Sequence, residues 1–235
     1  MKTIYYGEHQ GEIRGLSGEF YEEIENYVQE RYGLEKAQTI KRTALEDFQD
    51  ILINLPDIGG DKNPLIWTYI QAAVSLGFFL AAKVNGLSIE EAGRINYELI
   101  ESYYLSEEGA SSEQTATPES ITKQRERMKA ASGKLLWPEG WRTVYVEPAQ
   151  PSFDIGWDNT ECGILKLYDK YGAREFVPYI CMLDILIYPL RGLGIKRSRT
   201  LVESDHCDFR VKLQGHSSLE RFAQQRLKEW DKNRD

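Results

Sequence analysis

The segment from Leu65 to Ala82 carries no charged side chain and is rich in Ile, Leu, Val, Phe and Ala. A chain must bury such a segment, either in a protein core or in a membrane, which takes about 20 apolar residues to cross. Thr68, Gln71 and Ser75 interrupt it with polar groups, and Lys83 follows directly. Amphipathic stretches surround the segment, and we find no second span. We therefore expect a buried central helix, with a membrane helix as the alternative.

The first part of the chain has the spacing of amphipathic helices, with apolar residues recurring every three or four positions. Ser88 and Glu91 add the pattern of a capping box at the start of one helix. Helices are expected over residues 16–32, 36–55, 65–82 and 88–104. Residues 1–105 are thus predicted to form an N-terminal helical region that packs on the rest of the protein.

The pattern changes after residues 106–118, which are small, polar and without period, and which predict a flexible loop. Beyond it, residues 119–235 are predicted to form an α+β core. The expected elements are helix 119–131, strands 142–147 and 152–157, helices 160–171 and 174–190, strands 196–203 and 207–213, and helix 217–231. The order strand-strand-helix-helix-strand-strand predicts an antiparallel sheet covered by helices.

Composition narrows the possible partners. A net charge of -8 argues against nucleic acid, because phosphate binding needs a surplus of Lys and Arg. The local basic cluster Lys196, Arg197 and Arg199 is interpreted as a solvated strand face. The N-terminus has no long apolar stretch and the number of cysteines is odd, so we expect a cytoplasmic protein with reduced thiols and no membrane partner. A homo-oligomer stays possible.

Asp184 is the only charged residue of the apolar run Phe176–Leu190. A carboxylate buried there needs a partner or a proton. One interpretation is a structural pair with an Arg of the neighbouring strand. The other is a catalytic or substrate-holding carboxylate with a raised pKa. Cys181, three residues earlier, is expected on the same helix face.

Two further cysteines are candidate nucleophiles. If Asn159 or Thr160 caps a helix, Cys162 lies in its first turn, where free backbone N–H groups lower a thiol pKa. Glu161 beside it is typical of a first-turn acid. Cys207 begins a predicted strand whose alternation turns it toward the covering helices, where Cys181 and Asp184 can meet it.

The neighbours of Cys207 face the other way. In the run His206-Cys207-Asp208, the imidazole and the carboxylate can share a face, but neither easily serves the thiol. Arg210 shares the face of Asp208. The three thiols lie too far apart in the sequence for the close pairs typical of structural zinc. We therefore predict no cofactor, although a metal held by Cys162, Cys181 and Cys207 stays an alternative.

Four segments together resemble the L-2-amino-thiazoline-4-carboxylic acid hydrolase family. They are Thr160-Glu161-Cys162-Gly163-Ile164, Pro178-Tyr179-Ile180-Cys181-Met182-Leu183-Asp184, Arg197-Ser198-Arg199-Thr200-Leu201 and Cys207-Asp208-Phe209-Arg210. The close match covers about residues 150–213, and a weaker one runs through the Gly59-Gly60 loop. Two positions depart from the family pattern: His206 stands where a Gly is typical, and Leu165 where a second Cys is common.

The resemblance implies hydrolysis of a non-peptide C–N bond in a small cyclic isothiourea that bears a carboxylate. Asp184 would bind the protonated ring nitrogens or shuttle a proton, and Cys207 or Cys162 would be the nucleophile. Arg210 or the amides of Gly59 and Gly60 would hold the substrate carboxylate. Glu161, Cys181, Asp208 and His206 complete the predicted site.

A rival hypothesis from another class is a non-enzymatic module that binds a small molecule or a metal. The predicted order of elements is similar to that of vinyl-reductase-type ligand-binding domains, which is an analogy of fold alone. A third alternative is a scaffold whose cysteines only fill the core.

Overall fold

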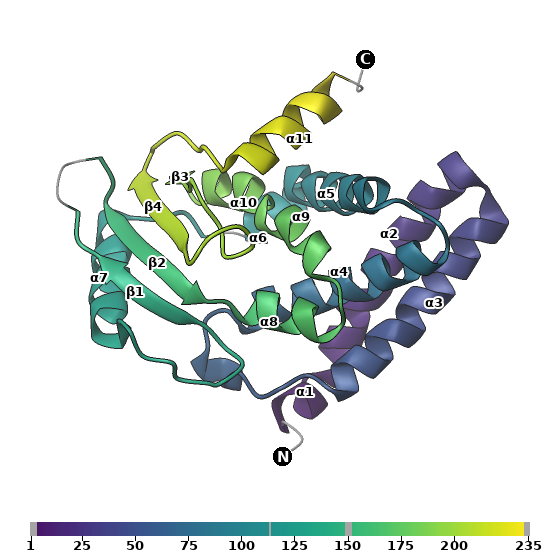
Figure 1. The fold of residues 1–235 in the computed structure, drawn as a ribbon, viewed down its shortest axis with the longest axis horizontal. Helices are drawn as coiled ribbons and strands as arrows, with labels where there is room; N and C mark the ends of the chain where they lie inside the picture. The colour runs from purple at the N-terminus through teal and green to yellow at the C-terminus, as the bar shows by residue number, and fades with distance from the viewer. Residues whose placement is uncertain (1–3, 113, 149–151, 233–235) are drawn as a thin grey trace. The chain divides into compact units, whose positions relative to one another are not determined.

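The computed structural model describes residues 4–112, 114–148 and 152–232, and the chain divides into two compact units (Figure 1). The helical unit contains residues up to Leu99 together with Lys166–Val177, and the sheet unit contains Ile100–Leu165 and the residues from Pro178 onward. The boundary therefore does not fall in the predicted loop 106–118, and the chain enters the helical unit twice.

Aromatic side chains explain the second entry. Tyr168 is fully buried and donates a hydrogen bond to the carbonyl of Ala72 at 2.8 Å. Phe176 stacks on Phe79, with ring centroids 4.3 Å apart. Residues 166–177 thus complete the core of the helical unit, although they lie far along the chain from its other helices.

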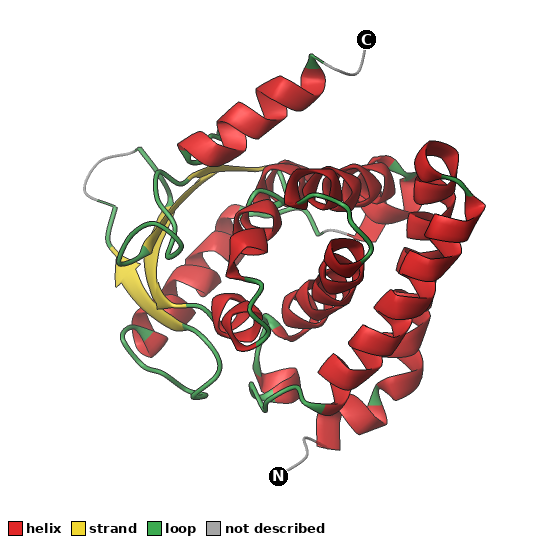
Figure 2. Ribbon diagram, turned by 45° about the vertical axis from the view of Figure 1, so that its right-hand side comes forward, coloured by secondary structure: helices red, strands yellow, loops and turns green. Residues whose placement is uncertain are grey.

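The helical unit is built around the apolar segment. Its helices are α1 (Ile4–Glu8), α2 (Gln10–Tyr32), α3 (Leu34–Ile53), the 3-10 turn η1 (Gly60–Lys62), α4 (Ile66–Val84) and the first part of α5 (Ile89–Leu105). Helices α2 and α3 run side by side (Figures 1 and 2), and both pack against α4. Helix α4 is buried over most of its length, as the uncharged sequence predicts. Among the described residues it alone has the length and apolarity of a membrane span, a test that core helices also pass.

The helices of this unit approach closely at Gly77. The Tyr21 hydroxyl donates to the carbonyl of Val74 at 2.8 Å. A Cβ at Gly77 would lie 2.6 Å from that hydroxyl oxygen and 3.1 Å from the carbonyl oxygen of Ala44. Only glycine fits at this contact, since backbone and a bonded hydroxyl cannot both move aside.

In the sheet unit, four described strands form one antiparallel sheet in the order β1-β2-β4-β3. The strands are β1 (Arg142–Val146), β2 (Ile155–Glu161), β3 (Leu193–Lys196) and β4 (Cys207–Leu213). Helix α7 (Pro118–Ala131) packs on β1 and β2, and α10 (Asp184–Leu190) packs on β3. The sheet unit also holds α6 (Glu107–Ser112), most of α9 (Val177–Cys181) and α11 (Arg221–Asp231), whereas η2 (Arg174–Phe176) and most of α8 (Gly163–Lys170) belong to the helical unit. The predicted α+β class and antiparallel sheet are confirmed.

Several predicted elements differ from the structure. The predicted loop 106–118 contains helix α6, and Thr117 caps α7 through a reciprocal pair of bonds with Ser120; residue 113 lies outside the described residues. The predicted helix 160–171 begins only at Gly163, because Asn159 pairs with Thr143 in the sheet. The predicted helix 217–231 begins at Arg221, because Ser218 bonds to the edge of β3.

The predicted helix 174–190 is broken into η2, α9 and α10. Around the break, the Leu183 N–H bonds to the carbonyl of Ile180 and the Ile185 N–H to that of Met182, at the three-residue spacing of a tight turn. The predicted strand 196–203 is wrong in its bounds, since β3 covers Leu193–Lys196 and shares only Lys196 with it. Arg197 leaves the strand because its N–H bonds to the carbonyl of Ser218 and its side chain turns inward.

We predict that Gly77→Ala lowers the free energy of unfolding by about 1–3 kcal/mol, because the new methyl group overpacks the contact between α2, α3 and α4. Gly15→Ala is the matched control. Nothing lies within 4 Å of a Cβ at this exposed position of α2, so greater helix propensity should raise stability by about 0.5–1 kcal/mol. Denaturant titration of both variants measures the effect, and equal stabilisation by both would contradict the tight contact.

Candidate functional site

The centre of the candidate site is Arg197, which is 3 % exposed. Its guanidinium donates from Nη1 to Oδ2 of Asp184 at 2.5 Å, from Nε to Oε2 of Glu220 at 3.0 Å, and from Nη2 to the carbonyl of Cys181 at 2.8 Å. It also lies over the ring of Phe209, 5.2 Å from the centroid. The prediction of a solvated basic face is therefore wrong for Arg197, because two carboxylates compensate its buried charge.

Asp184 is the first residue of α10 and pairs with an Arg beside strand β3. Its side chain is 26 % exposed, whereas that of Arg197 is 1 % exposed. Burial raises the pKa of Asp184, and the charge of Glu220 adds to this, while Arg197 and Arg191 oppose it. The ion pair with Arg197 agrees with the structural interpretation of Asp184. The raised pKa agrees with the catalytic interpretation.

Cys162 lies between the end of β2 and the start of α8. The thiol accepts hydrogen bonds from the backbone N–H groups of Ile164 and Leu165, as expected at a helix N-terminus. Burial nevertheless raises its pKa, and this effect exceeds the lowering by the hydrogen bonds. The expectation of a low pKa is therefore wrong, because the helix end that should stabilise a thiolate is itself buried.

The other two thiols are also protonated at neutral pH. Cys207 is 7 % exposed and accepts a hydrogen bond from the Leu201 N–H at 3.1 Å. Burial raises the pKa of Cys207 to about 11, and burial raises the pKa of Cys181 as well. Cys162 and Cys207 both add to the raised pKa of Cys181, and Cys162 adds to that of Cys207. The sheet unit thus brings Cys162, Cys181 and Cys207 into one neighbourhood, around Arg197.

Within the described part of the chain, no group of three His, Cys, Asp or Glu side chains is arranged to hold a metal ion. A metal held by the three thiols stays an alternative to the prediction of no cofactor.

Two predicted residues of the segment around Cys207 have partners elsewhere. His206 Nδ1 lies 2.7 Å from a carboxylate oxygen of Asp205 rather than near Asp208. Asp208 accepts bonds from the N–H groups of Ser198 and Arg199, both at 2.8 Å, and from the Ser198 hydroxyl at 2.6 Å. Its partial burial would raise its pKa, but these hydrogen bonds more than offset that effect and lower it. Asp208 therefore ties down the segment between β3 and β4.

Arg210 and Glu161 are likewise bonded to the sheet. Arg210 Nη1 lies 2.8 Å from Oδ1 of Asp158 on the neighbouring strand, so its charge already has a carboxylate partner. Glu161 accepts from Nε of Arg142 at 2.7 Å, across β1 and β2. Both side chains have charged partners outside the Arg197 cluster.

Gly59 and Gly60 belong to the helical unit, and so are not part of the cluster in the sheet unit. The N–H of Gly59 donates to Asp57 Oδ1 at 2.8 Å, which occupies one amide that was expected to hold a substrate carboxylate. A Cβ at Gly60 would lie 2.9 Å from the ring of Tyr5. These contacts give the glycines a structural role in the loop.

Sequence reasoning missed Glu220, which binds Arg197 through both carboxylate oxygens. An acid just before an amphipathic helix is typical of a solvated first turn, so its position carried no signal. The buried Asp184 did predict an Arg partner. The strong apolarity of residues 176–190 was the available sign that this partner would be buried too.

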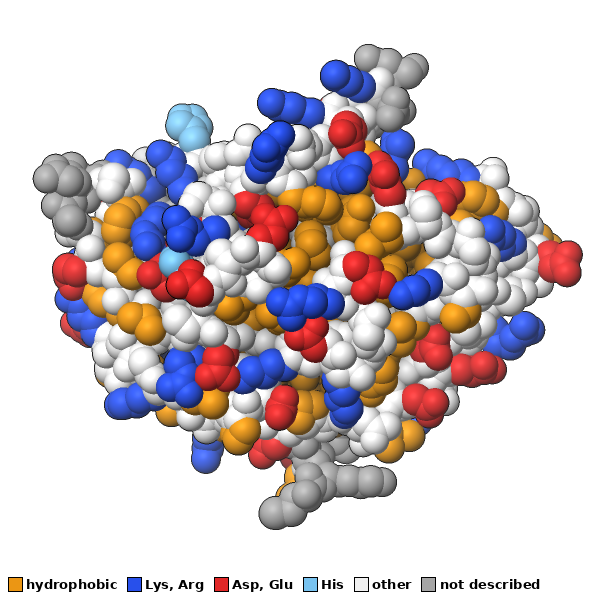
Figure 3. Space-filling model, in the orientation of Figure 1, with side chains coloured by type: hydrophobic (Ala, Val, Ile, Leu, Met, Phe, Trp, Pro, Cys, Tyr) orange, Lys and Arg blue, Asp and Glu red, His pale blue; other side chains and the backbone are white. Residues whose placement is uncertain are grey.

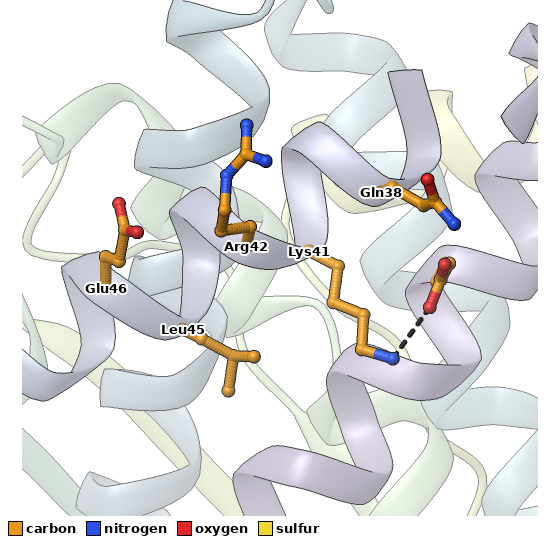
Figure 4. Close-up of a pocket in the computed structure, with 6 residues that line it drawn as sticks. Gln38, Lys41, Arg42, Leu45 and Glu46 are labelled. Atoms are coloured by element: carbon orange, nitrogen blue, oxygen red, sulfur yellow. Dashed lines mark hydrogen bonds and ion pairs between the residues drawn. The ribbon is translucent and has the colours of Figure 1, made fainter. Parts of the chain in front are cut away.

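A separate recess lies on the helical unit between α2 and α3 (Figure 4). Its lining residues are Glu25, Gln38, Lys41, Arg42, Leu45 and Glu46. Lys41 Nζ lies 2.6 Å from Oε2 of Glu25, so its charge is already compensated. None of the predicted site residues lines this recess. On the described part of the face drawn in Figure 3, acidic and basic side chains are interspersed rather than gathered by sign.

Fold and site together define an α+β protein with a buried cluster of one arginine, two carboxylates and three neighbouring thiols beside a four-stranded antiparallel sheet. Comparison with protein-family models, with curated proteins and with solved structures finds no match for the chain. Its function is therefore argued from the chemistry of this cluster.

We predict that the native thiols react slowly with iodoacetamide at pH 7. A pKa of about 11 at Cys207 leaves about 100-fold less thiolate than a free thiol with a pKa near 9. Labelling should rise steeply only at alkaline pH, and unfolding should abolish the protection. Mass mapping of each cysteine across pH, with and without a chelator, measures this. A single cysteine that labels rapidly below pH 7 would restore the thiolate mechanism, and labelling released by the chelator would indicate a metal site.

We also predict a pH-dependent role for Asp208. Its folded pKa is lowered, so its contribution to stability is present above the ordinary value of 3.8 and is lost as the pH falls through the folded value. Asp208→Asn should lower the free energy of unfolding by about 1 kcal/mol at pH 7, a modest figure because the group is partly exposed. The difference should vanish at low pH. Asp205→Asn, at a neighbouring acid that is 87 % exposed, is the control.

Proposed function

We propose that the protein is a hydrolase that acts on a non-peptide C–N bond of a small cyclic amidine or thiazoline bearing a carboxylate, such as L-2-amino-thiazoline-4-carboxylate. The observation that carries the proposal is Asp184, a partly exposed carboxyl with a raised pKa in a cluster that holds more carboxylates than cations. Such a group suits the recognition of a protonated amidine. The resemblance of residues 150–213 to the thiazoline hydrolases supports the same substrate class.

The reaction needs a base, an acid and a water molecule. Water adds to the amidine carbon while Asp184 accepts one of its protons. The ring C–N bond then breaks as the added hydroxyl becomes a carbonyl. The ring nitrogen, already protonated in the substrate, takes up the proton held by Asp184 and the hydroxyl proton, and leaves as an ammonium group. The product is an S-carbamoyl thiol that still bears its carboxylate, and it differs from the substrate by one water. Asp184 returns to its initial state after each turnover.

The chemistry is assigned to Asp184 rather than to sulfur because burial raises the pKa of all three cysteines. A nucleophilic thiol must first lose its proton, and neither Cys162 nor Cys207 has a neighbouring base that the structure identifies within the described residues. In this proposal the thiols pack around the cluster, and the backbone of Cys181 helps to hold Arg197 through its carbonyl.

A second candidate function is a non-enzymatic module that binds a small cationic ligand. The protonated state of the thiols favours it, because a binding site needs no reactive sulfur. The same surplus of carboxylate over cation would hold the ligand without turnover. Catalysis therefore has to be separated from binding by experiment.

We expect Asp184→Asn to reduce turnover of L-2-amino-thiazoline-4-carboxylate by about 10²–10⁴-fold, the range for loss of a general base. Cys207→Ala and Cys162→Ala should keep turnover, whereas a covalent mechanism would lose it in one of them. Asp205→Asn controls for removal of an acid outside the cluster. Product formation and calorimetric binding should be measured together. Binding without turnover by the wild-type protein would support the binding module, and neither binding nor turnover would reject this substrate.

A further inference from the structure

Glu220 and Asp184 share Arg197 unequally. Glu220 takes the bidentate face of the guanidinium, with Nε to Oε2 at 3.0 Å and Nη2 to Oε1 at 3.3 Å. Asp184 receives one bond, from Nη1 to Oδ2. The Glu220 side chain is 6 % exposed and that of Asp184 is 26 % exposed. Glu220 therefore holds the arginine through two buried contacts, and Asp184 through one short contact at a carboxyl that is partly exposed.

Among the groups that are bonded to one another, the charges do not balance when both acids are ionised, although Arg191 also acts on Asp184 as a cation. One guanidinium then faces two carboxylates, and its third partner, the carbonyl of Cys181, is neutral. A surplus charge in a buried site is costly unless a proton neutralises it. Protonation of Asp184 weakens one hydrogen bond at a partly exposed carboxylate. Protonation of Glu220 would weaken two hydrogen bonds at a buried one. When the cluster takes up a proton, Asp184 is therefore the expected acceptor.

We infer that Glu220 is a positioning residue of this site: by occupying the bidentate face of Arg197, it leaves Asp184 with a single contact and a surplus negative charge, and so with a proton affinity that a fully paired aspartate lacks. The inference deepens the proposed function, in which Asp184 transfers a proton. The inference concerns the titration of Asp184 in the protein without substrate, so it can be tested without turnover.

Burial is the largest cause of the raised pKa of Asp184, and Glu220 is the charged neighbour that adds to it. Arg191, at the end of α10, is a cation and lowers the pKa of Asp184. Tyr188 on the same helix is a phenol whose own pKa is raised, first by burial and then by Asp184, so it is neutral in the relevant range. Cys181 is neutral for the same reason of burial. Arg197 and Glu220 are the two remaining charges, and of these only Glu220 is negative.

The experiment is a carboxyl carbon NMR titration of Asp184 in the wild-type protein and in Glu220→Gln. We expect the wild-type pKa of Asp184 to lie above its ordinary value of 3.8, and the substitution to lower it by about one unit or more, since Arg197 then serves one carboxylate. Glu229→Gln is the matched control. Glu229 lies in α11, pairs with Arg226 at 2.6 Å and should leave the titration of Asp184 unchanged.

A wild-type pKa at or below the ordinary value, or a titration that Glu220→Gln leaves in place, overturns the inference. If the role of Glu220 is purely structural, Glu220→Gln would lower the stability of the protein without changing the pKa of Asp184. Glu220→Asp keeps the negative charge and should keep the pKa of Asp184 raised. If Glu220→Gln does not fold, Glu220→Ser removes the same charge, and an unchanged titration of Asp184 in that variant would be decisive against the inference. Absence of turnover would reject the proposed function and leave this result standing.

Discussion

The sheet unit depends on the burial of one charge, that of Arg197. Its guanidinium connects the end of α9 through the Cys181 carbonyl, the start of α10 through Asp184, and the entry to α11 through Glu220. Removing one partner from a buried ion pair typically costs about 3–5 kcal/mol, because the remaining charge is left uncompensated. The breaks and starts of several helices are thus set by where this arginine finds its acceptors.

That dependence explains which parts of the structure follow from the sequence. The antiparallel sheet and the central helix α4 are predictable because alternation and apolarity are local patterns. The break at residues 182–183 is not, since the run 176–190 has the composition of one helix. The turn brings Asp184 to Arg197, a partner 13 residues away, and no local pattern encodes that distance. The same holds for Glu220, 23 residues from Arg197.

At Cys162, the expected position and hydrogen bonds are present, but the low pKa predicted from them is not. The position next to a helix N-terminus was predicted, and the backbone N–H groups of Ile164 and Leu165 do bond to the thiol. Those bonds favour a thiolate, whereas removal from water disfavours it, and here burial is the larger effect. Sequence gives the position of the thiol along the helix but not the depth at which that helix end is packed.

The balance of charge around Arg197 also limits the kind of chemistry that the sheet unit supports. Protonated thiols supply bulk and weak hydrogen bonds, and Glu220 is saturated by the arginine. Asp184 is left as the group with both solvent access and a proton to exchange. A hydrolase and a binding module would use the same carboxyl, the first by moving its proton and the second by keeping its charge. The two functions therefore differ in what happens at one atom, Oδ1 or Oδ2 of Asp184, rather than in the architecture around it.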